Sequence, residues 1–143
     1  MTAKLLPLIP PHREYVEVFG GGASLLFAKE PSAIETYNDI DEGLTNLFLV
    51  IQNKYQFKEF YRLVSLMPYS RSEYNFCRDN WRLETDKVKQ AYMFFIVARM
   101  GFSGRIYAGF GTVIKSSSNN MSATTSKYLS IIKMLPEIHE RIM

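Results

Sequence analysis

The sequence contains one cysteine and no long apolar run, and these absences exclude two broad classes of protein. Cys77 has no second cysteine to pair with, so an internal disulfide is excluded and the cytoplasm is the expected location. The longest apolar stretches, such as residues 44–51, are far shorter than the roughly 20 residues of a membrane span. Prolines at positions 7, 10 and 11 interrupt any signal peptide. We therefore expect no membrane partner.

Clusters of metal-binding side chains are also missing. His12 and His139 are far apart along the chain, and Cys77 has no nearby ligand. Because a metal site needs several such side chains at close spacing, we expect no metal and interpret these three residues as structural or exposed.

Acidic residues are absent from residues 87–136, although the chain as a whole carries a net charge of only +3. Residues 1–70 hold 6 Lys/Arg and 8 Asp/Glu, whereas residues 71–143 hold 11 and 6. Seven cations lie in the acid-free stretch, interleaved with aromatic residues: Lys87, Lys89, Arg99, Arg105, Lys115, Lys127 and Lys133. Such a charge distribution favours a polyanionic partner. A solvated surface over a helical core explains the same composition equally well.

The residues that are present are those of a packed globular protein. The chain has 143 residues, of which 47% are hydrophobic and 14% aromatic. This length suits one ordinary domain or two small lobes.

Strand and helix patterns alternate in the first third of the chain. A β-rich run at residues 15–19 ends in Gly20–Gly22, and a helix-forming segment follows at 23–28. A second short strand is predicted at 34–37. Asp41 then stands where it can cap a helix with the apolar face Leu44, Leu47, Phe48 and Ile51. Residues 15–53 therefore predict a β-α-β-α order.

The rest of the chain is mostly helical in pattern. One amphipathic helix is predicted from Phe57 to Met67, and another from Val88 to Ala98 that Asp86 can cap and Gly101 can end. Gly, Ser, Thr and Asn dominate residues 101–126, which predicts a long loop or irregular hairpin. A final helix is expected from Lys127, with an interruption at Pro136.

The glycine turn at Phe19–Ala23 carries the most informative chemistry. A strand-to-helix turn without side chains lets a ligand approach the backbone at the carboxyl edge of a sheet. Asp39 follows at the end of the next strand, where a carboxylate can accept hydrogen bonds from ribose hydroxyls. Leu25 stands where a dinucleotide-binding fingerprint has its third glycine, so a nicotinamide cofactor is disfavoured. A glycine turn with an acidic residue can equally bind S-adenosylmethionine, whose adenosine has the same ribose. The alternative is a structural turn with a helix-capping aspartate.

The sequence resembles the Dam-like N6-adenine DNA methyltransferases in four ordered segments. They are LLPLIP at 5–10 with YVEVFGGGA at 15–23, NDID at 38–41, PYSR at 68–71 with Glu73, and FF at 94–95 with RMGFSG at 99–104. The first two segments are the more specific.

This resemblance implies a fold class and candidate sites. The fold would be α/β, with a partial Rossmann-like S-adenosylmethionine-binding unit at residues 1–54 and a mostly helical DNA target-recognition region at 55–143. The resemblance assigns cofactor binding to the turn residues Phe19, Gly20, Gly21 and Gly22, to Asp39 at the ribose and to Ile40 against the adenine. In the recognition region, phosphate contacts are expected from Arg99, Arg105 and Lys115, and base contacts from Asn119 and Asn120.

Two departures from the family pattern affect the expected activity. The family's Gly-Gly-Lys element before the Leu-Leu-Pro segment is absent or replaced by Lys4, and its catalytic Asp-Pro-Pro-Tyr occurs nowhere in the chain. Without the acceptors and the aromatic ring of that tetrapeptide, the weakly nucleophilic adenine amine would not be activated. We therefore assign no catalytic residue and expect the chain to be inactive alone. Beside the methyltransferase part, the alternatives are a non-catalytic DNA-binding module or truncated remnant, and a helical interaction protein.

The expected sheet also points to a partner. Two parallel strands leave edges that a stable sheet normally covers. We expect either a missing C-terminal portion or second chain to complete the sheet, or a homodimer through its open edge.

Overall fold

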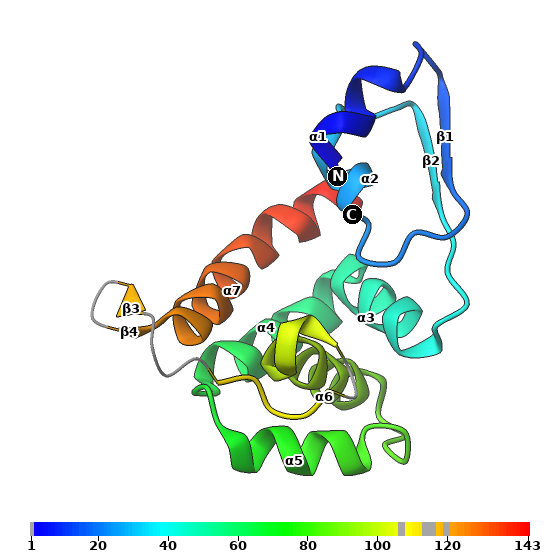
Figure 1. The fold of residues 1–143 in the computed structure, drawn as a ribbon. Coiled ribbons are helices and arrows are strands. Elements are labelled where there is room, and N and C mark those ends of the chain that lie inside the picture. Colours follow the sequence, from blue (N-terminus) through cyan, green and yellow to red (C-terminus); the bar gives the residue numbers. More distant parts are fainter. Residues whose placement is uncertain (1, 106–107, 113–116, 119–120) are drawn as a thin grey trace. The chain divides into compact units, whose positions relative to one another are not determined.

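The computed structural model describes residues 2–105, 108–112, 117–118 and 121–143 (Figure 1). By its internal contacts the chain divides into two compact units, Met1–Thr45 and Asn46–Met143, called unit 1 and unit 2 below. The boundary falls within helix α3 (Glu42–Gln52). This division follows contacts, whereas the boundary expected after residue 54 separates cofactor binding from DNA recognition. That functional boundary therefore stays a prediction.

Unit 1 contains a parallel pair of strands joined through a short helix. Strand β1 (Glu14–Glu17) leads to helix α2 (Ser24–Ala28) and then to strand β2 (Ile34–Tyr37). The strands pair in register from Glu14–Ile34 to Glu17–Tyr37 and lie side by side in Figure 1. The predicted strand, turn, helix and strand are thus confirmed. A short helix α1 (Thr2–Leu5) and a 3-10 turn η1 (Leu6–Leu8) precede them, and α1 packs against α2.

The start of α3 also follows the sequence prediction. Asp41 Oδ1 accepts a hydrogen bond from the Leu44 N–H at 3.0 Å, which satisfies one of the unpaired donors of the first turn. Of the predicted apolar face, Leu47 and Ile51 are buried.

A buried lysine fixes α2 to the sheet. Lys29 Nζ lies 2.5 Å from Glu35 Oε1 and donates to Ser32 Oγ at 2.7 Å. It also lies 4.6 Å from the centre of the Tyr15 ring. Because charges are rarely buried without partners, this ion pair and cation–π contact explain how a lysine is accommodated there. The other face of the sheet carries Val16 and Ile34, which remain about half exposed.

Unit 2 is built around one helix that is buried on nearly every side. Helix α6 (Lys87–Met100) has no buried residue in its first turn, but all seven residues from Ala91 to Val97 are buried. A helix that is apolar all round is stable only inside a core. Helices α4 (Lys54–Leu66), α5 (Arg71–Asn80) and α7 (Ala123–Ile142) pack against it. The predicted Asp86 cap is confirmed, since its side chain accepts from the Lys89 N–H at 2.8 Å.

Two predictions about helices in unit 2 are wrong or incomplete. Helix α7 begins at Ala123, earlier than expected, and runs through Pro136 without interruption. Burial of Tyr128, Ile132 and Leu135 on the face of α7 that packs against α4 outweighs the roughly 3 kcal/mol cost of an interior proline. The sequence pattern does not predict helix α5, because few of its residues are apolar and buried. The Ser70 side chain caps this helix by accepting a hydrogen bond from the Glu73 N–H at 3.3 Å.

The segment predicted as a long loop contains short regular pieces. A 3-10 turn, η2 (Phe102–Gly104), follows α6, and Gly101 forms an antiparallel bridge with Phe110. Strands β3 (Ser117–Ser118) and β4 (Met121–Ser122) form a two-stranded antiparallel pair before α7. This agrees with an irregular hairpin.

The described residues show neither a bilayer-spanning helix nor a metal centre. None of their helices is long and apolar enough to cross a membrane. Within the same residues, no three potential metal ligands of the His, Cys, Asp or Glu type lie together.

Candidate functional site

The Asp39 carboxylate is held beside the glycine turn at the carboxyl end of β2. Its Oδ2 accepts a hydrogen bond from the Gly21 N–H at 2.7 Å, and its Oδ1 accepts from the Asp41 N–H at 2.9 Å. The backbone hydrogen bonds from Asp41 and Gly21 hold the pKa of Asp39 below its usual value, so the group is a carboxylate at neutral pH. Each oxygen keeps acceptor capacity for a further donor. The predicted proximity of Asp39 to the glycine turn is therefore present.

The turn itself is shaped by the ring of Tyr37. A Cβ at Gly20 would overlap this ring, so any other residue would displace the ring from this position. The Tyr37 hydroxyl donates to Gly21 O at 2.7 Å, and the Gly20 N–H donates to Asn38 O at 2.9 Å. Gly21 has φ +49°, which favours glycine. Burial, followed by the nearby Asp39 charge, raises the pKa of Tyr37 to about 12, so the phenol stays a neutral donor.

Two large apolar side chains at the turn lie outside the core. Phe19 is 90% exposed and Ile40 is 94% exposed. Phe19 lies two residues before Gly21 in the chain, and Ile40 directly follows Asp39. A carboxylate with exposed apolar residues close to it in the chain suits a ligand that has both hydroxyl donors and a flat apolar ring.

Sequence reasoning missed Glu17, the last residue of β1. Its Oε1 accepts from the Tyr15 hydroxyl at 3.4 Å, whereas its Oε2 is buried and has no hydrogen-bond partner among the described residues. A buried acceptor without a partner is costly unless a ligand or water satisfies it. The available signal was the acidic residue between Val16 and Val18, which is the only charged residue in the β-rich run at 15–19.

The residues predicted to contact DNA fall into three groups. Arg99 lies in the last turn of α6, with its guanidinium carbon 5.9 Å from the centre of the Phe95 ring. Arg105 is exposed just after η2. Lys115, Asn119 and Asn120 lie outside the described residues, so their assignment stays a prediction.

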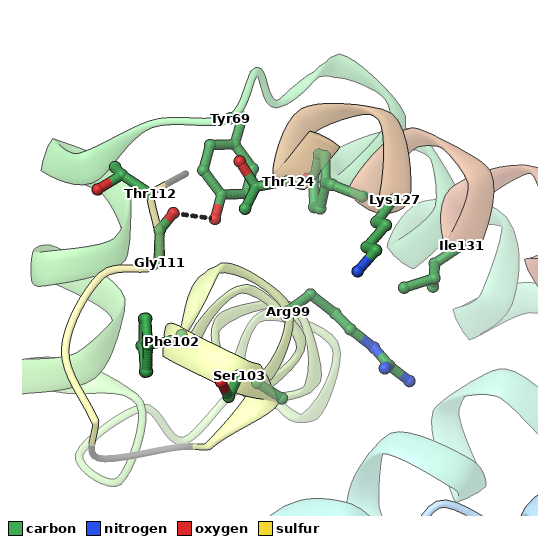
Figure 2. A pocket seen from close by; sticks show the side chains of 12 residues that line it. Tyr69, Arg99, Phe102, Ser103, Gly111, Thr112, Thr124, Lys127 and Ile131 are labelled. Atoms are coloured by element: carbon green, nitrogen blue, oxygen red, sulfur yellow. Dashed lines mark hydrogen bonds between the residues drawn. The ribbon is translucent and has the colours of Figure 1, made fainter. Parts of the chain in front are cut away.

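A pocket of about 380 Å³ adjoins Arg99 in unit 2 (Figure 2). It is lined by the end of α6, residues 101–103, residues 111–112 and the first turns of α7, and Arg105 is not among its lining residues. Lys127 of α7 also lines it, together with Tyr69 from the connection between α4 and α5. The structure thus brings together side chains that the sequence analysis treated separately.

The family model of the D12 class N6 adenine-specific DNA methyltransferases matches residues 2–128. The chain belongs to this family. Comparison with curated proteins gives no match. The family assignment agrees with the resemblance to N6-adenine DNA methyltransferases that the sequence motifs indicated.

Both candidate sites of this D12 class methyltransferase family member fall within the matched residues. The match includes the glycine turn and Asp39 in unit 1, and it reaches past Arg99 and Lys127 in unit 2. The family accounts for the class of reaction, methylation of adenine in DNA, and makes DNA the macromolecular substrate to be considered for the basic region.

Proposed function

We propose that unit 1 binds S-adenosylmethionine and that unit 2 recognises double-stranded DNA, so that the chain is the cofactor-binding and target-recognition part of a DNA adenine N6-methyltransferase. The observation that carries this proposal is the Asp39 carboxylate, which is hydrogen-bonded to the glycine turn, with the exposed residues Phe19 and Ile40 close to this pair in the chain. The family assignment supplies the reaction class.

The residues around the turn fit the parts of this cofactor. Asp39 can accept hydrogen bonds from the two ribose hydroxyls, and Ile40 and Phe19 offer apolar surfaces for the adenine ring. The bare backbone at Gly20–Gly22 allows close approach, and the unpartnered Glu17 Oε2 suits a cationic or N–H donor. When bound, the cofactor would supply an activated methyl group on its sulfonium centre.

Charge supports DNA as the partner of unit 2. The acid-free stretch at residues 87–136 carries seven cations, and the family acts on DNA. Lys and Arg contacts to phosphates would supply sequence-independent affinity, and amide side chains such as those of Asn119 and Asn120 would be suited to reading adenine edges.

Methyl transfer requires groups that these 143 residues do not provide. The adenine amine needs hydrogen-bond acceptors and a stacking ring to orient its lone pair, and no Asp-Pro-Pro-Tyr segment occurs in the sequence. We therefore propose that these residues bind cofactor and DNA without transferring methyl groups, and that another polypeptide segment or chain supplies the catalytic tetrapeptide. Incorporation of labelled methyl into unmethylated duplex DNA by the isolated chain would contradict this.

The missing tetrapeptide also favours the second candidate, a DNA-binding module without catalysis. The two candidates differ in cofactor binding, because a module that only binds DNA has no use for S-adenosylmethionine. Light scattering tests the further expectation of a homodimer through the open sheet edge, and a monomer mass at high concentration would exclude it.

Isothermal titration with S-adenosylmethionine tests the cofactor site through Ile40→Ala. Because Ile40 is 94% exposed, its truncation removes ligand contact without opening a cavity. We expect a loss of about 1 kcal/mol, or roughly fivefold in affinity. Leu83→Ala is the matched control, since Leu83 is 77% exposed in unit 2. Equal affinities of the two variants would exclude Ile40 from the site, and no binding by the wild type would remove the cofactor proposal.

A further inference from the structure

The pocket beside Arg99 has a wall formed by closely packed backbone. The Gly111 N–H donates to Met100 O at 2.8 Å, and the Phe102 N–H donates to Gly109 O at 2.7 Å. A Cβ at Gly111 would lie 3.1 Å from Gly101 O, closer than ordinary packing allows. The Tyr69 hydroxyl donates to Gly111 O at 2.6 Å and fixes this wall to the connection between α4 and α5 (Figure 2). Hydrogen bonds within the protein therefore fix the position of this wall.

The charge that lines the pocket is entirely positive. Arg99 and Lys127 line it from α6 and α7, and no Asp or Glu is among its lining residues. Neither cation forms an ion pair with another described residue. Residues 87–136, which include both cations, contain no acid. Two unpaired cations at one concave site attract an anionic group.

The remaining lining groups suit an anion attached to an organic ring. The hydroxyls of Thr112 and Ser103 are hydrogen-bond donors of the kind that contact phosphate oxygens, whereas Thr124 Oγ1 is already hydrogen-bonded to Ser122 Oγ at 3.1 Å. Phe102 also lines the pocket and is 53% exposed, so its ring is available for stacking. Figure 2 shows Phe102 and Ser103 on the η2 side of the pocket, with Lys127 and Thr124 on the α7 side.

We propose that this pocket binds one phosphate and the adjoining nucleoside of a DNA strand. Arg99 and Lys127 contact the phosphate, a hydroxyl from the 103 or 112 position donates to its oxygens, and Phe102 packs against the sugar or base. The volume of about 380 Å³ lies within the range of pockets that hold small organic groups, which agrees with a single nucleotide unit. The inference rests on the proposed DNA recognition by unit 2 and specifies which residues grip the strand.

The test measures binding of the full chain to a fluorescently labelled duplex by anisotropy, over a series of salt concentrations. Lys127→Met is compared with Lys58→Met, which removes an exposed lysine of α4 that lies outside the acid-free stretch and does not line the pocket. If Lys127 contacts a phosphate, its loss lowers the slope of log affinity against log salt by about 0.9. The Lys58 variant should keep the slope of the wild type.

The stacking contact is tested separately. Phe102→Ala is compared with Leu83→Ala, another exposed apolar residue of unit 2. Loss of a stacked base typically lowers affinity by about fivefold or more, whereas the Leu83 variant should bind like the wild type. Reaction of the buried Cys77 with a thiol reagent, which stays slow in a folded chain, verifies that each variant is folded.

The outcomes separate this inference from the proposed function. If the wild type binds DNA but Lys127→Met and Phe102→Ala match their controls, the pocket assignment is overturned while DNA recognition stands. If the wild type shows no salt-dependent DNA binding, both are overturned. If dAMP binds with a lower affinity in the Phe102 variant while duplex DNA does not bind, the pocket takes free nucleotides and the DNA assignment is wrong. If polyglutamate competes for the chain as well as DNA does, the site attracts anions non-specifically and the pocket assignment is overturned.

Discussion

Alanine substitutions at Gly20, Gly21 and Gly22 should have clearly graded effects, because these consecutive glycines meet different surroundings. A Cβ at Gly20 would overlap the Tyr37 ring, whereas at Gly22 the nearest atom would be Ser24 Oγ at 4.0 Å. At Gly21 there is open space, but its φ of +49° strains any residue with a side chain.

The structure gives the magnitude for each variant. For Gly20→Ala, overpacking of about 1–3 kcal/mol adds to the loss of about 1 kcal/mol as Tyr37 is pushed from its bond to Gly21 O, so we expect about 2–4 kcal/mol in total. For Gly21→Ala, the left-handed backbone costs about 1–2 kcal/mol. For Gly22→Ala, we expect a change within about 0.5 kcal/mol, which makes it the matched control.

Hydrogen exchange measured by mass spectrometry on peptides covering β1 and β2 reports the local free energy of opening. Protection should fall in the order Gly22→Ala, Gly21→Ala, Gly20→Ala. Equal protection in the Gly20 and Gly22 variants would refute the packing of the turn against Tyr37.

Three further predictions concern single groups. Because the pKa of Asp39 is lowered in the folded state, its stabilisation of the turn is complete above the unfolded value of about 3.9 and is lost as pH falls through the folded pKa. Acid should therefore reduce the exchange protection of β1 and β2 in the wild type, and reduce it less in Asp39→Asn. Asp86→Ala should destabilise α6 by about 1 kcal/mol in urea unfolding followed by Trp81 fluorescence, while Asp79→Ala, which breaks only an exposed pair, should cost less than about 0.5 kcal/mol. Cys77 is 0% exposed, and this burial raises the pKa of its thiol. The thiol should therefore react with thiol reagents far more slowly in the native chain than in urea, and a fast reaction of the native chain would contradict its burial.

Local patterns predicted much of the order of elements. The glycine turn between two β-rich runs predicted β1, α2 and β2, and Asp41 and Asp86 predicted the starts of α3 and α6. These features depend on hydrogen bonds and periodicities spanning a few residues, which a sequence contains directly. The proximity of Asp39 to the glycine turn was also predictable, because parallel strands bring their carboxyl ends to the same edge.

Pattern reasoning failed where contacts between distant residues outweigh local preference. Helix α7 passes through Pro136 because its apolar face packs on α4. All residues of α6 from Ala91 to Val97 are buried, although the sequence pattern predicts a single apolar face. In both cases the burial of side chains against other helices supplies more free energy than the local propensities that guided the prediction.

The sequence by itself therefore determined the family, the glycine turn with its acidic partner, and the excess of positive charge in the second half of the chain. Only the tertiary structure decided that the Glu17 carboxylate is buried with an unpartnered oxygen, and that Arg99, Phe102 and Lys127 line one pocket. The physical reason is distance along the chain. Hydrogen bonds within a turn are specified by neighbouring residues, whereas a pocket exists only when separate helices and their connections pack together.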